Sequence, residues 1–95
     1  MKHNKKFYVV VYDIHKDKNR DRISKLLEKY GIRVNYSVFE CLFTEKQLTT
    51  VQEKALKLID KHRDSIIYYP ICMNCYVGIC YQPKQLHTVF TVDVV

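Results

Sequence analysis

A single carboxylate at the end of an apolar run is the first candidate for chemistry. Residues 7–14 read FYVVVYDI, and Asp13 is the only charged residue among them. The two-residue period of a strand places Asp13 on the same face as Val9 and Val11. A carboxylate suits a hard divalent cation, which prefers oxygen ligands. One carboxylate is too few, so a symmetry mate would have to supply a second one. The alternative is structural: Asp13 caps the next helix or pairs with Arg20.

Basic and polar residues approach the same point. Arg20 and Arg22 fall in the first turn expected of the next helix, where a cation opposes the helix dipole. That placement is reasonable if both side chains face phosphate. Ser37 and Phe39 arrive from the neighbouring extended segment, and His15 is the histidine nearest to the strand end. Together these residues indicate a candidate site for a phosphate-bearing ligand.

The overall charge favours a polyanionic partner. The 95 residues carry 16 Lys and Arg against 10 Asp and Glu, which gives a net charge of +6. Phosphates attract such a surface and release counterions on binding, although a basic surface that is merely well solvated has the same composition. Charge alone does not separate nucleic acid from a membrane surface. No run of 18 apolar residues is present, and the apolar run behind the basic N-terminus is short. We therefore expect a cytoplasmic protein without a membrane span or a signal peptide.

The cysteines leave three interpretations open. Cys72 and Cys75 form a CxxC pair, which is half of a zinc-ribbon pattern, but no second CxxC follows. Cys80 and His87 would complete four zinc ligands only with unusual spacing. The second interpretation is a redox pair. The third, which is favoured, is that the thiols are reduced and packed.

The elements that position the candidate site begin with a strand and a helix. The run 7–14 is apolar on both faces and predicts a central strand. The apolar residues that follow have the spacing of an amphipathic helix: Ile23, Leu26, Leu27 and Tyr30. We expect Asp17 at its N-cap and Gly31 at its C′ position. Residues 33–43 are extended, as one long strand or as two short strands broken near 36–37.

The second half of the chain repeats this pattern. Thr44 and Gln47 have the spacing of a capping box, which predicts a helix that ends near 61–63. Residues 65–72 predict a further strand, and their single proline suggests a sheet edge or a strand end. Residues 76–81 are expected to return as another strand.

This order predicts one α+β domain that spans residues 1–95. Two helices on one face of a mainly antiparallel sheet give a ferredoxin-like βαββαβ sandwich. The tail, about 88–95, reads TVFTVDVV from Thr88 and is strongly β. A terminal strand this apolar needs a partner edge, so we expect it to pair with a partner subunit in a homodimer.

Four blocks of the sequence resemble the CRISPR-associated Cas2 family, the small adaptation protein. They are Tyr12-Asp13-Ile14, Asn19-Arg20-x-Arg22-Ile23, Gly31 to Glu40, and Asp64 to Cys72. The resemblance covers nearly the whole chain, and the block Tyr36-Ser37-Val38-Phe39 is its specific part. Asn35 stands where the family often has Gln, which is a mild departure.

The resemblance implies a ferredoxin-like homodimer whose two sheets face each other. It implies that Asp13 of the two subunits together hold Mg²⁺ or Mn²⁺, and that the pair cleaves phosphodiester bonds. Family residues tied to that activity match the following positions, with Ser37 beside them: Tyr12, Arg20, Arg22, Arg33 and Phe39.

The resemblance also implies a role in capturing foreign DNA together with a CRISPR-associated integrase. It implies an endonuclease that cleaves single-stranded RNA, double-stranded DNA or both. The alternative is a catalytically silent dimeric scaffold that binds duplex DNA in the integrase complex. An RNA-binding sheet of the RRM type is disfavoured, because the chain lacks that fold's signature strand.

Overall fold

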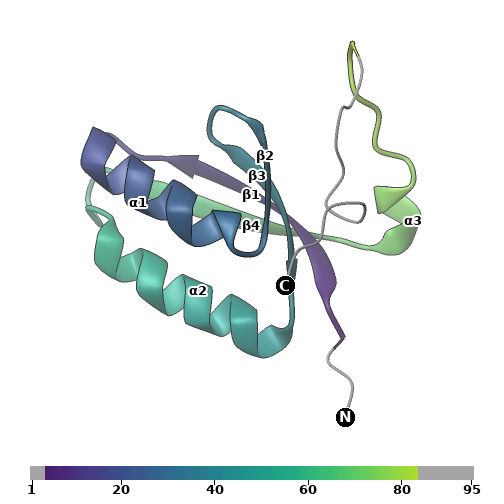
Figure 1. Ribbon diagram of the computed structural model, residues 1–95, viewed down its shortest axis with the longest axis horizontal. Coiled ribbons are helices and arrows are strands. Elements are labelled where there is room, and N and C mark those ends of the chain that lie inside the picture. Colours follow the sequence, from purple (N-terminus) through teal and green to yellow (C-terminus); the bar gives the residue numbers. More distant parts are fainter. Residues whose placement is uncertain (1–3, 84–95) are drawn as a thin grey trace.

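The structure of this chain is a computed structural model that describes residues 4–83. The predicted C-terminal strand, 88–95, lies outside the described residues. The elements are β1 (Lys6–Asp13), α1 (Asp17–Glu28), β2 (Gly31–Asn35), β3 (Val38–Phe43), α2 (Glu45–Leu58), β4 (Ser65–Ile71) and the one-turn α3 (Met73–Tyr76). The first six confirm the predicted βαββαβ order (Figure 1).

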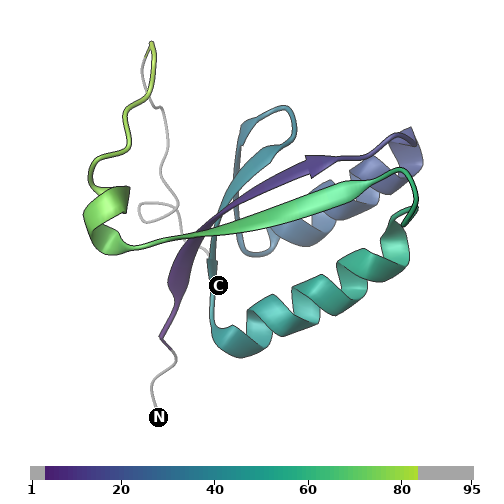
Figure 2. The same ribbon diagram turned by 180° about the vertical axis from the view of Figure 1, so that it is seen from behind.

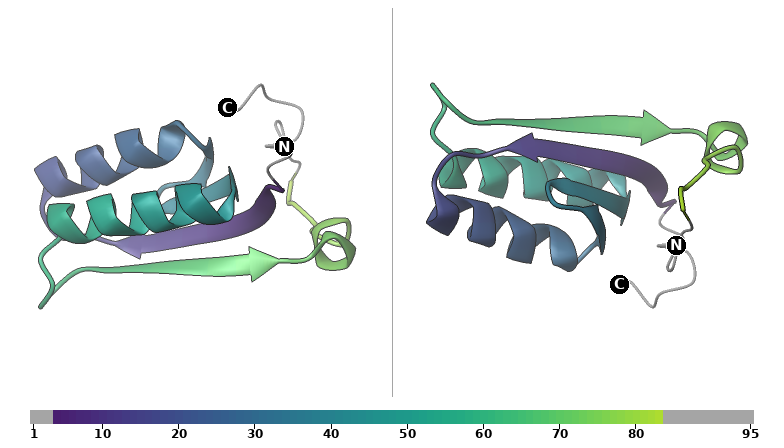
Figure 3. Two further views of the ribbon diagram at one scale, coloured as in Figure 1. Left: turned by 90° about the horizontal axis from the view of Figure 1, so that it is seen from below. Right: turned by 90° about the horizontal axis from the view of Figure 1, so that it is seen from above.

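The four strands form one antiparallel sheet in the order β2-β3-β1-β4. As predicted, β1 is central, and β4 is an edge strand together with β2. Helices α1 and α2 lie side by side on one face of the sheet (Figures 1 and 3). Figure 2 shows the molecule from behind, with the face that neither of these helices covers. The fold is therefore a two-layer α+β sandwich of the ferredoxin-like kind.

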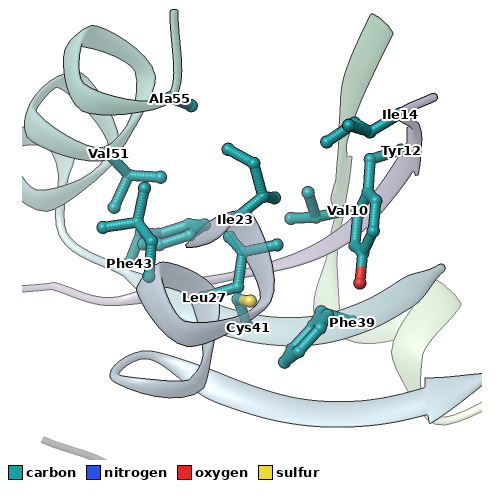
Figure 4. Packing of buried hydrophobic residues seen from close by; sticks show 11 residues of the cluster. Val10, Tyr12, Ile14, Ile23, Leu27, Phe39, Cys41, Phe43, Val51 and Ala55 are labelled. Atoms are coloured by element: carbon teal, nitrogen blue, oxygen red, sulfur yellow. The ribbon is translucent and has the colours of Figure 1, made fainter. Parts of the chain in front are cut away.

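The hydrophobic core lies between the helices and the sheet (Figure 4). It contains alternate residues along β1 and just beyond its end, namely Val10, Tyr12 and Ile14, as strand parity predicts. Facing residues of the helices and of β3 complete it: Ile23, Leu26, Leu27, Phe39, Cys41, Phe43, Val51 and Ala55. Burial of each large apolar side chain contributes roughly 1.5–3 kcal/mol, so this layer is the main source of stability.

The opposite face of the sheet is also apolar, but it is only partly covered. Cross-strand neighbours in an antiparallel pair point to the same side, so the register places Val11 beside Ile67 and Val9 beside Tyr69 on this face. Ile67 is 45% exposed and Tyr69 is 48% exposed. We call this surface the open face of the sheet.

Two expected helix boundaries of α1 are wrong. The N-cap is Lys16, which makes no side-chain cap bond, and Asp17 is instead the first helical residue. The helix ends at Glu28, and Gly31 begins β2 without a positive φ. Glycine is required at position 31 for another reason: a Cβ there would lie 2.0 Å from the Glu40 carbonyl oxygen. Close contact between β2 and β3, not a helix cap, explains this residue.

Later elements show a mixture of confirmed and wrong boundaries. The capping box of α2 is present, because Thr44 accepts from the Gln47 N–H and Gln47 accepts from the Thr44 N–H. The helix ends at Leu58, several residues before the predicted 61–63. The extended segment is two strands, β2 and β3, joined at residues 36–37. The predicted strand at 76–81 is wrong, since the chain forms α3 and then irregular structure.

Within the part of the chain that the structure describes, no helix is both long and apolar enough to cross a membrane.

Candidate functional site

Asp13 is the last residue of β1 and lies on the open face, opposite Ser65 of β4. Its side chain is exposed, and among residues 4–83 it has no hydrogen-bond or ion-pair partner. Asp13 neither caps α1 nor pairs with Arg20, the two structural roles that the sequence left open. The N-cap of α1 is Lys16, and the guanidinium of Arg20 pairs with Asp17. The carboxylate of Asp13 is therefore available to a ligand.

Arg20 is fixed against the connection between β1 and α1. Its Nη1 donates to Asp17 Oδ1 at 2.8 Å, and its Nε donates to the Ile14 carbonyl at 3.3 Å. Its Nη2 donates to the His15 carbonyl at 3.4 Å. The hydrogen bond to Asp17 raises the pKa of the Arg20 guanidinium. These contacts offset the unfavourable helix dipole, and they hold a cation at the strand end that also carries Asp13.

The guanidinium carbon of Arg20 lies 5.8 Å from the centre of the Tyr36 ring. Tyr36 is 66% exposed in the turn between β2 and β3. A cation over an aromatic ring at this distance is a favourable contact. The arginine and the turn therefore form one exposed surface at this end of the sheet.

Tyr12, Phe39 and Arg33 form a layer on the helix side of the sheet. The rings of Tyr12 and Phe39 are 6.2 Å apart between centres, and Figure 4 shows them adjacent in the core. The Arg33 guanidinium lies 5.7 Å from the centre of the Phe39 ring and donates to the Ser24 hydroxyl. Phe39 is 0% exposed and Tyr12 is 2% exposed. The structure thus buries two of the predicted site residues on the face opposite Asp13.

The two remaining predicted residues are less constrained. Ser37 lies in the turn before β3, and its carbonyl accepts from the Tyr12 N–H at 3.1 Å. Arg22 is exposed on α1, in its second turn rather than in the first as predicted. The structure therefore brings Asp13, Arg20 and the 36–37 turn to one end of the sheet, and it leaves Arg22 on the helix surface.

A contact between His15 and Asp64 was missed by sequence reasoning. Asp64 Oδ1 accepts from both the backbone N–H and the Nδ1 of His15 at 3.0 Å, and its Oδ2 accepts from the Asp60 N–H at 2.8 Å. The Asp64 side chain is 1% exposed. The bond from Asp60 first, and then those from His15, lower the pKa of Asp64 to about 2. Asp64 thus links His15, two residues beyond the end of β1, to the connection between α2 and β4. Only the block Asp64 to Cys72 could have drawn attention to it.

A buried carboxylate on the open face was also missed. Glu40 in β3 is 3% exposed and accepts a hydrogen bond from the Tyr81 hydroxyl. Burial first, and then Glu40, raises the pKa of Tyr81. Oε1 of Glu40 is buried without a partner among the described residues. The one signal in the sequence is an acid at an open-face position of an otherwise apolar strand.

Asp13 alone does not make a metal site. No group of three His, Cys, Asp or Glu side chains within residues 4–83 is placed to hold a metal ion. Asp13 supplies a hard anionic oxygen donor, which fits Mg²⁺ or Mn²⁺ in kind but not in number. The donor set fits such an ion when two chains each contribute one carboxylate.

Comparisons with known proteins identify the family of this chain. A family described as CRISPR associated protein Cas2 matches residues 6–79. The Synechocystis sp. protein called CRISPR-associated endoribonuclease Cas2 3 is 41% identical over 64 residues, which are 67% of this chain and 70% of that protein. The Thermus thermophilus protein called CRISPR-associated endonuclease Cas2 2 is 40% identical over 67 residues, 70% of this chain and 74% of that protein.

Solved structures of Cas2 proteins are similar to this chain as well. Streptococcus pyogenes Cas2 superposes with a TM-score of 0.73 at 29% identity, over 79% of this chain and 96% of that chain. A chain of a partial Cas6-RT-Cas1–Cas2 complex superposes with a TM-score of 0.71 at 31% identity, over 81% of this chain and 90% of that chain. The fold is therefore that of a small ferredoxin-like CRISPR protein. The chain belongs to the CRISPR-associated protein Cas2 family.

Proposed function

We propose that this chain is a metal-dependent endonuclease of CRISPR adaptation that cleaves phosphodiester bonds in single-stranded RNA, double-stranded DNA or both. The observation that carries the proposal is the exposed Asp13 carboxylate, which ends a central strand and has no structural partner among residues 4–83. The neighbouring Arg20 supplies positive charge suited to a phosphate. The names of similar proteins, an endoribonuclease and an endonuclease, support the same reaction class.

The proposal requires a homodimer. Asp13 shares the open face with Ile67 and Tyr69, whose side chains are about half exposed. A second copy packed against this face removes these apolar side chains from water. A two-fold axis near the end of β1 brings the two Asp13 carboxylates together, since a symmetric interface presents the same residue from both chains.

Each predicted residue has a role in this proposal. Asp13 of both subunits would hold Mg²⁺ or Mn²⁺, and the ion would supply Lewis-acid chemistry at a phosphoryl oxygen and at water. Arg20 contacts the scissile phosphate from its fixed position at the strand end, and the exposed Arg22 binds the backbone further along. Ser37 donates to substrate from the β2–β3 turn.

The buried residues act through their neighbours. Tyr12 and Phe39 are core side chains, so we assign them as positioning residues that fix the end of β1 relative to β3. Arg33 joins β2 to α1 through Ser24 and stacks on Phe39, so it positions the same strand ends.

The test compares wild type, Asp13→Asn and the matched control Asp21→Asn, which removes an exposed carboxylate of α1 instead. Labelled single-stranded RNA and duplex DNA are incubated with Mg²⁺, Mn²⁺ or EDTA. We expect metal-dependent cleavage by wild type and Asp21→Asn, and its loss in Asp13→Asn with an unchanged circular dichroism spectrum and unchanged dimer mass. Cleavage that persists in pure Asp13→Asn protein contradicts the assignment.

A second function, a catalytically silent scaffold for the integrase, is favoured by the net charge of +6 and by the similarity to a chain of a Cas1-containing complex. It predicts duplex binding that weakens steeply with salt and is equal in wild type and Asp13→Asn. Binding without cleavage in every metal condition would leave the scaffold as the function. Binding that ignores salt would refute it.

A further inference from the structure

A pair of cysteines lies far from the strand-end site. β4 runs from Ser65, which is opposite Asp13, to Ile71, which is opposite Phe7. Cys72 follows directly, and Cys75 lies in the one-turn helix α3. A seven-residue strand spans roughly 20 Å, so the pair is separated from Asp13 by the length of the sheet. Figure 3 shows α3 beyond the end of β4.

Both thiols are free and exposed. This contradicts the favoured prediction that the cysteines are packed, which holds only for Cys41. The chain therefore keeps a CxxC pair on its surface, where packing gives no reason for it.

Cys72 and Cys75 are three residues apart at the start of one helical turn, a spacing that places side chains next to each other. Cys72 has extended backbone angles, φ −72° and ψ 164°, and immediately precedes α3. The Cys72 side chain makes no cap hydrogen bond, but the nearby backbone N–H and thiol of Cys75 lower the pKa of the Cys72 thiol. The nearby Cys72 sulfur raises the pKa of the Cys75 thiol. Cys72 is thus the sulfur of the pair that ionises more readily, and Cys75 is its neighbour in the CxxC spacing.

We propose that Cys72 and Cys75 form a thiol–disulfide exchange site that reacts with low-molecular-weight disulfides such as oxidised glutathione. Cys72 is the attacking sulfur and Cys75 is the resolving one.

The exchange balances in two steps. The Cys72 thiolate attacks one sulfur of glutathione disulfide, a new S–S bond forms, and glutathione thiolate leaves with the electron pair of the old bond. Cys75 then loses its proton and attacks the Cys72 sulfur, which displaces the second glutathione. The protein dithiol is oxidised to a disulfide, one glutathione disulfide is reduced to two glutathione thiols, and the two cysteine protons end on them.

The other two cysteines are internal controls. Cys41 is 0% exposed in the core, and burial raises its pKa to about 12, so it stays a thiol in the folded protein. Cys80 is exposed, but it lies outside the CxxC pair and its thiol donates to the Gly78 carbonyl. Exchange is therefore expected within one pair and not among all surface thiols.

The test starts from the fully reduced full-length chain. It is equilibrated with mixtures of reduced and oxidised glutathione and quenched with acid. The protein is then denatured and alkylated, and its intact mass is measured by mass spectrometry. Wild type is expected to lose two of its four alkylatable thiols as the fraction of oxidised glutathione rises, and peptide mapping is expected to place the bond between Cys72 and Cys75. Cys80→Ser is expected to behave as wild type.

Single variants separate the roles of the two sulfurs. Cys75→Ser is expected to accumulate a mixed disulfide with glutathione at Cys72, because the resolving thiol is missing. Cys72→Ser is expected to form neither the internal bond nor a rapid adduct at Cys75. The proposal is overturned if wild type retains four alkylatable thiols in excess oxidised glutathione, if the bond involves Cys80, or if stoichiometric zinc co-purifies and blocks both thiols.

Discussion

Replacement of Gly31 by alanine tests how β2 is held against β3. A Cβ at position 31 would lie 2.0 Å from the Glu40 carbonyl oxygen and 2.7 Å from the Cys41 Cα, both backbone atoms. Real Cβ contacts below 3.0 Å are essentially absent, so the two strands would have to separate by about 1 Å. Arg33 lies two residues further along β2 and would move with it.

The loss of folding stability expected for Gly31→Ala follows from this separation of the strands. Overpacking of a tight contact costs about 1–3 kcal/mol. Each weakened ladder hydrogen bond adds about 1 kcal/mol. We expect Gly31→Ala to lower the free energy of unfolding by about 2–4 kcal/mol, a large part of the roughly 5–15 kcal/mol typical of a domain. For a chain of this length the melting temperature would fall by on the order of 10–30 °C.

The chain offers a matched control, because its only other glycine has room for a methyl group. At Gly78 the nearest atom to an added Cβ is 3.5 Å away, and neither glycine has a positive φ. Gly78→Ala should leave stability unchanged or raise it by up to about 1 kcal/mol. Urea and thermal unfolding followed by circular dichroism measure both variants. If Gly31→Ala is within about 0.5 kcal/mol of Gly78→Ala, the argument from close strand contact is wrong.

Two further substitutions test the contacts around the site. Asp64→Asn should destabilise the protein at pH 7, because the carboxylate accepts from Asp60 and His15. Since folding lowers the Asp64 pKa from near 3.8 to about 2, its stabilising effect is complete above pH 4 and is lost as the pH falls from 4 to 2. Urea unfolding at a series of pH values should show the difference from wild type shrinking in that window, and a constant difference would count against this reading. Thr44→Ala, which removes the N-cap of α2, should cost about 1 kcal/mol, while Thr49→Ala on the exposed side of the same helix should cost less.

Much of the architecture could be predicted because it depends on local patterns. The continuous apolar run in FYVVVYDI specified a strand, strand parity gave its two faces, and apolar residues on both faces indicated a central position. Thr44 and Gln47 specified the start of α2, since the capping box is complete within four residues. Asp13 was recognised as the carboxylate at the strand end for the same reason.

Other predictions failed where distant residues decide the outcome. Gly31 was assigned to a helix end, but its neighbour is the Glu40 backbone in the next strand, nine residues away. The end of α2 was placed too late because the apolar spacing continues to Ile59, whereas the chain leaves the helix there with an extended conformation.

The sequence by itself determined the order of elements, the two faces of β1 and the family to which the chain belongs. Periodicity and short motifs act over a few residues, so they are complete in the sequence. Only the tertiary structure decided that Tyr12 and Phe39 are buried on the face opposite Asp13, that Asp64 anchors His15, and that Cys72 and Cys75 stay exposed. These outcomes depend on which strands pair and in which register, and that is set by the packing of residues far apart in the chain.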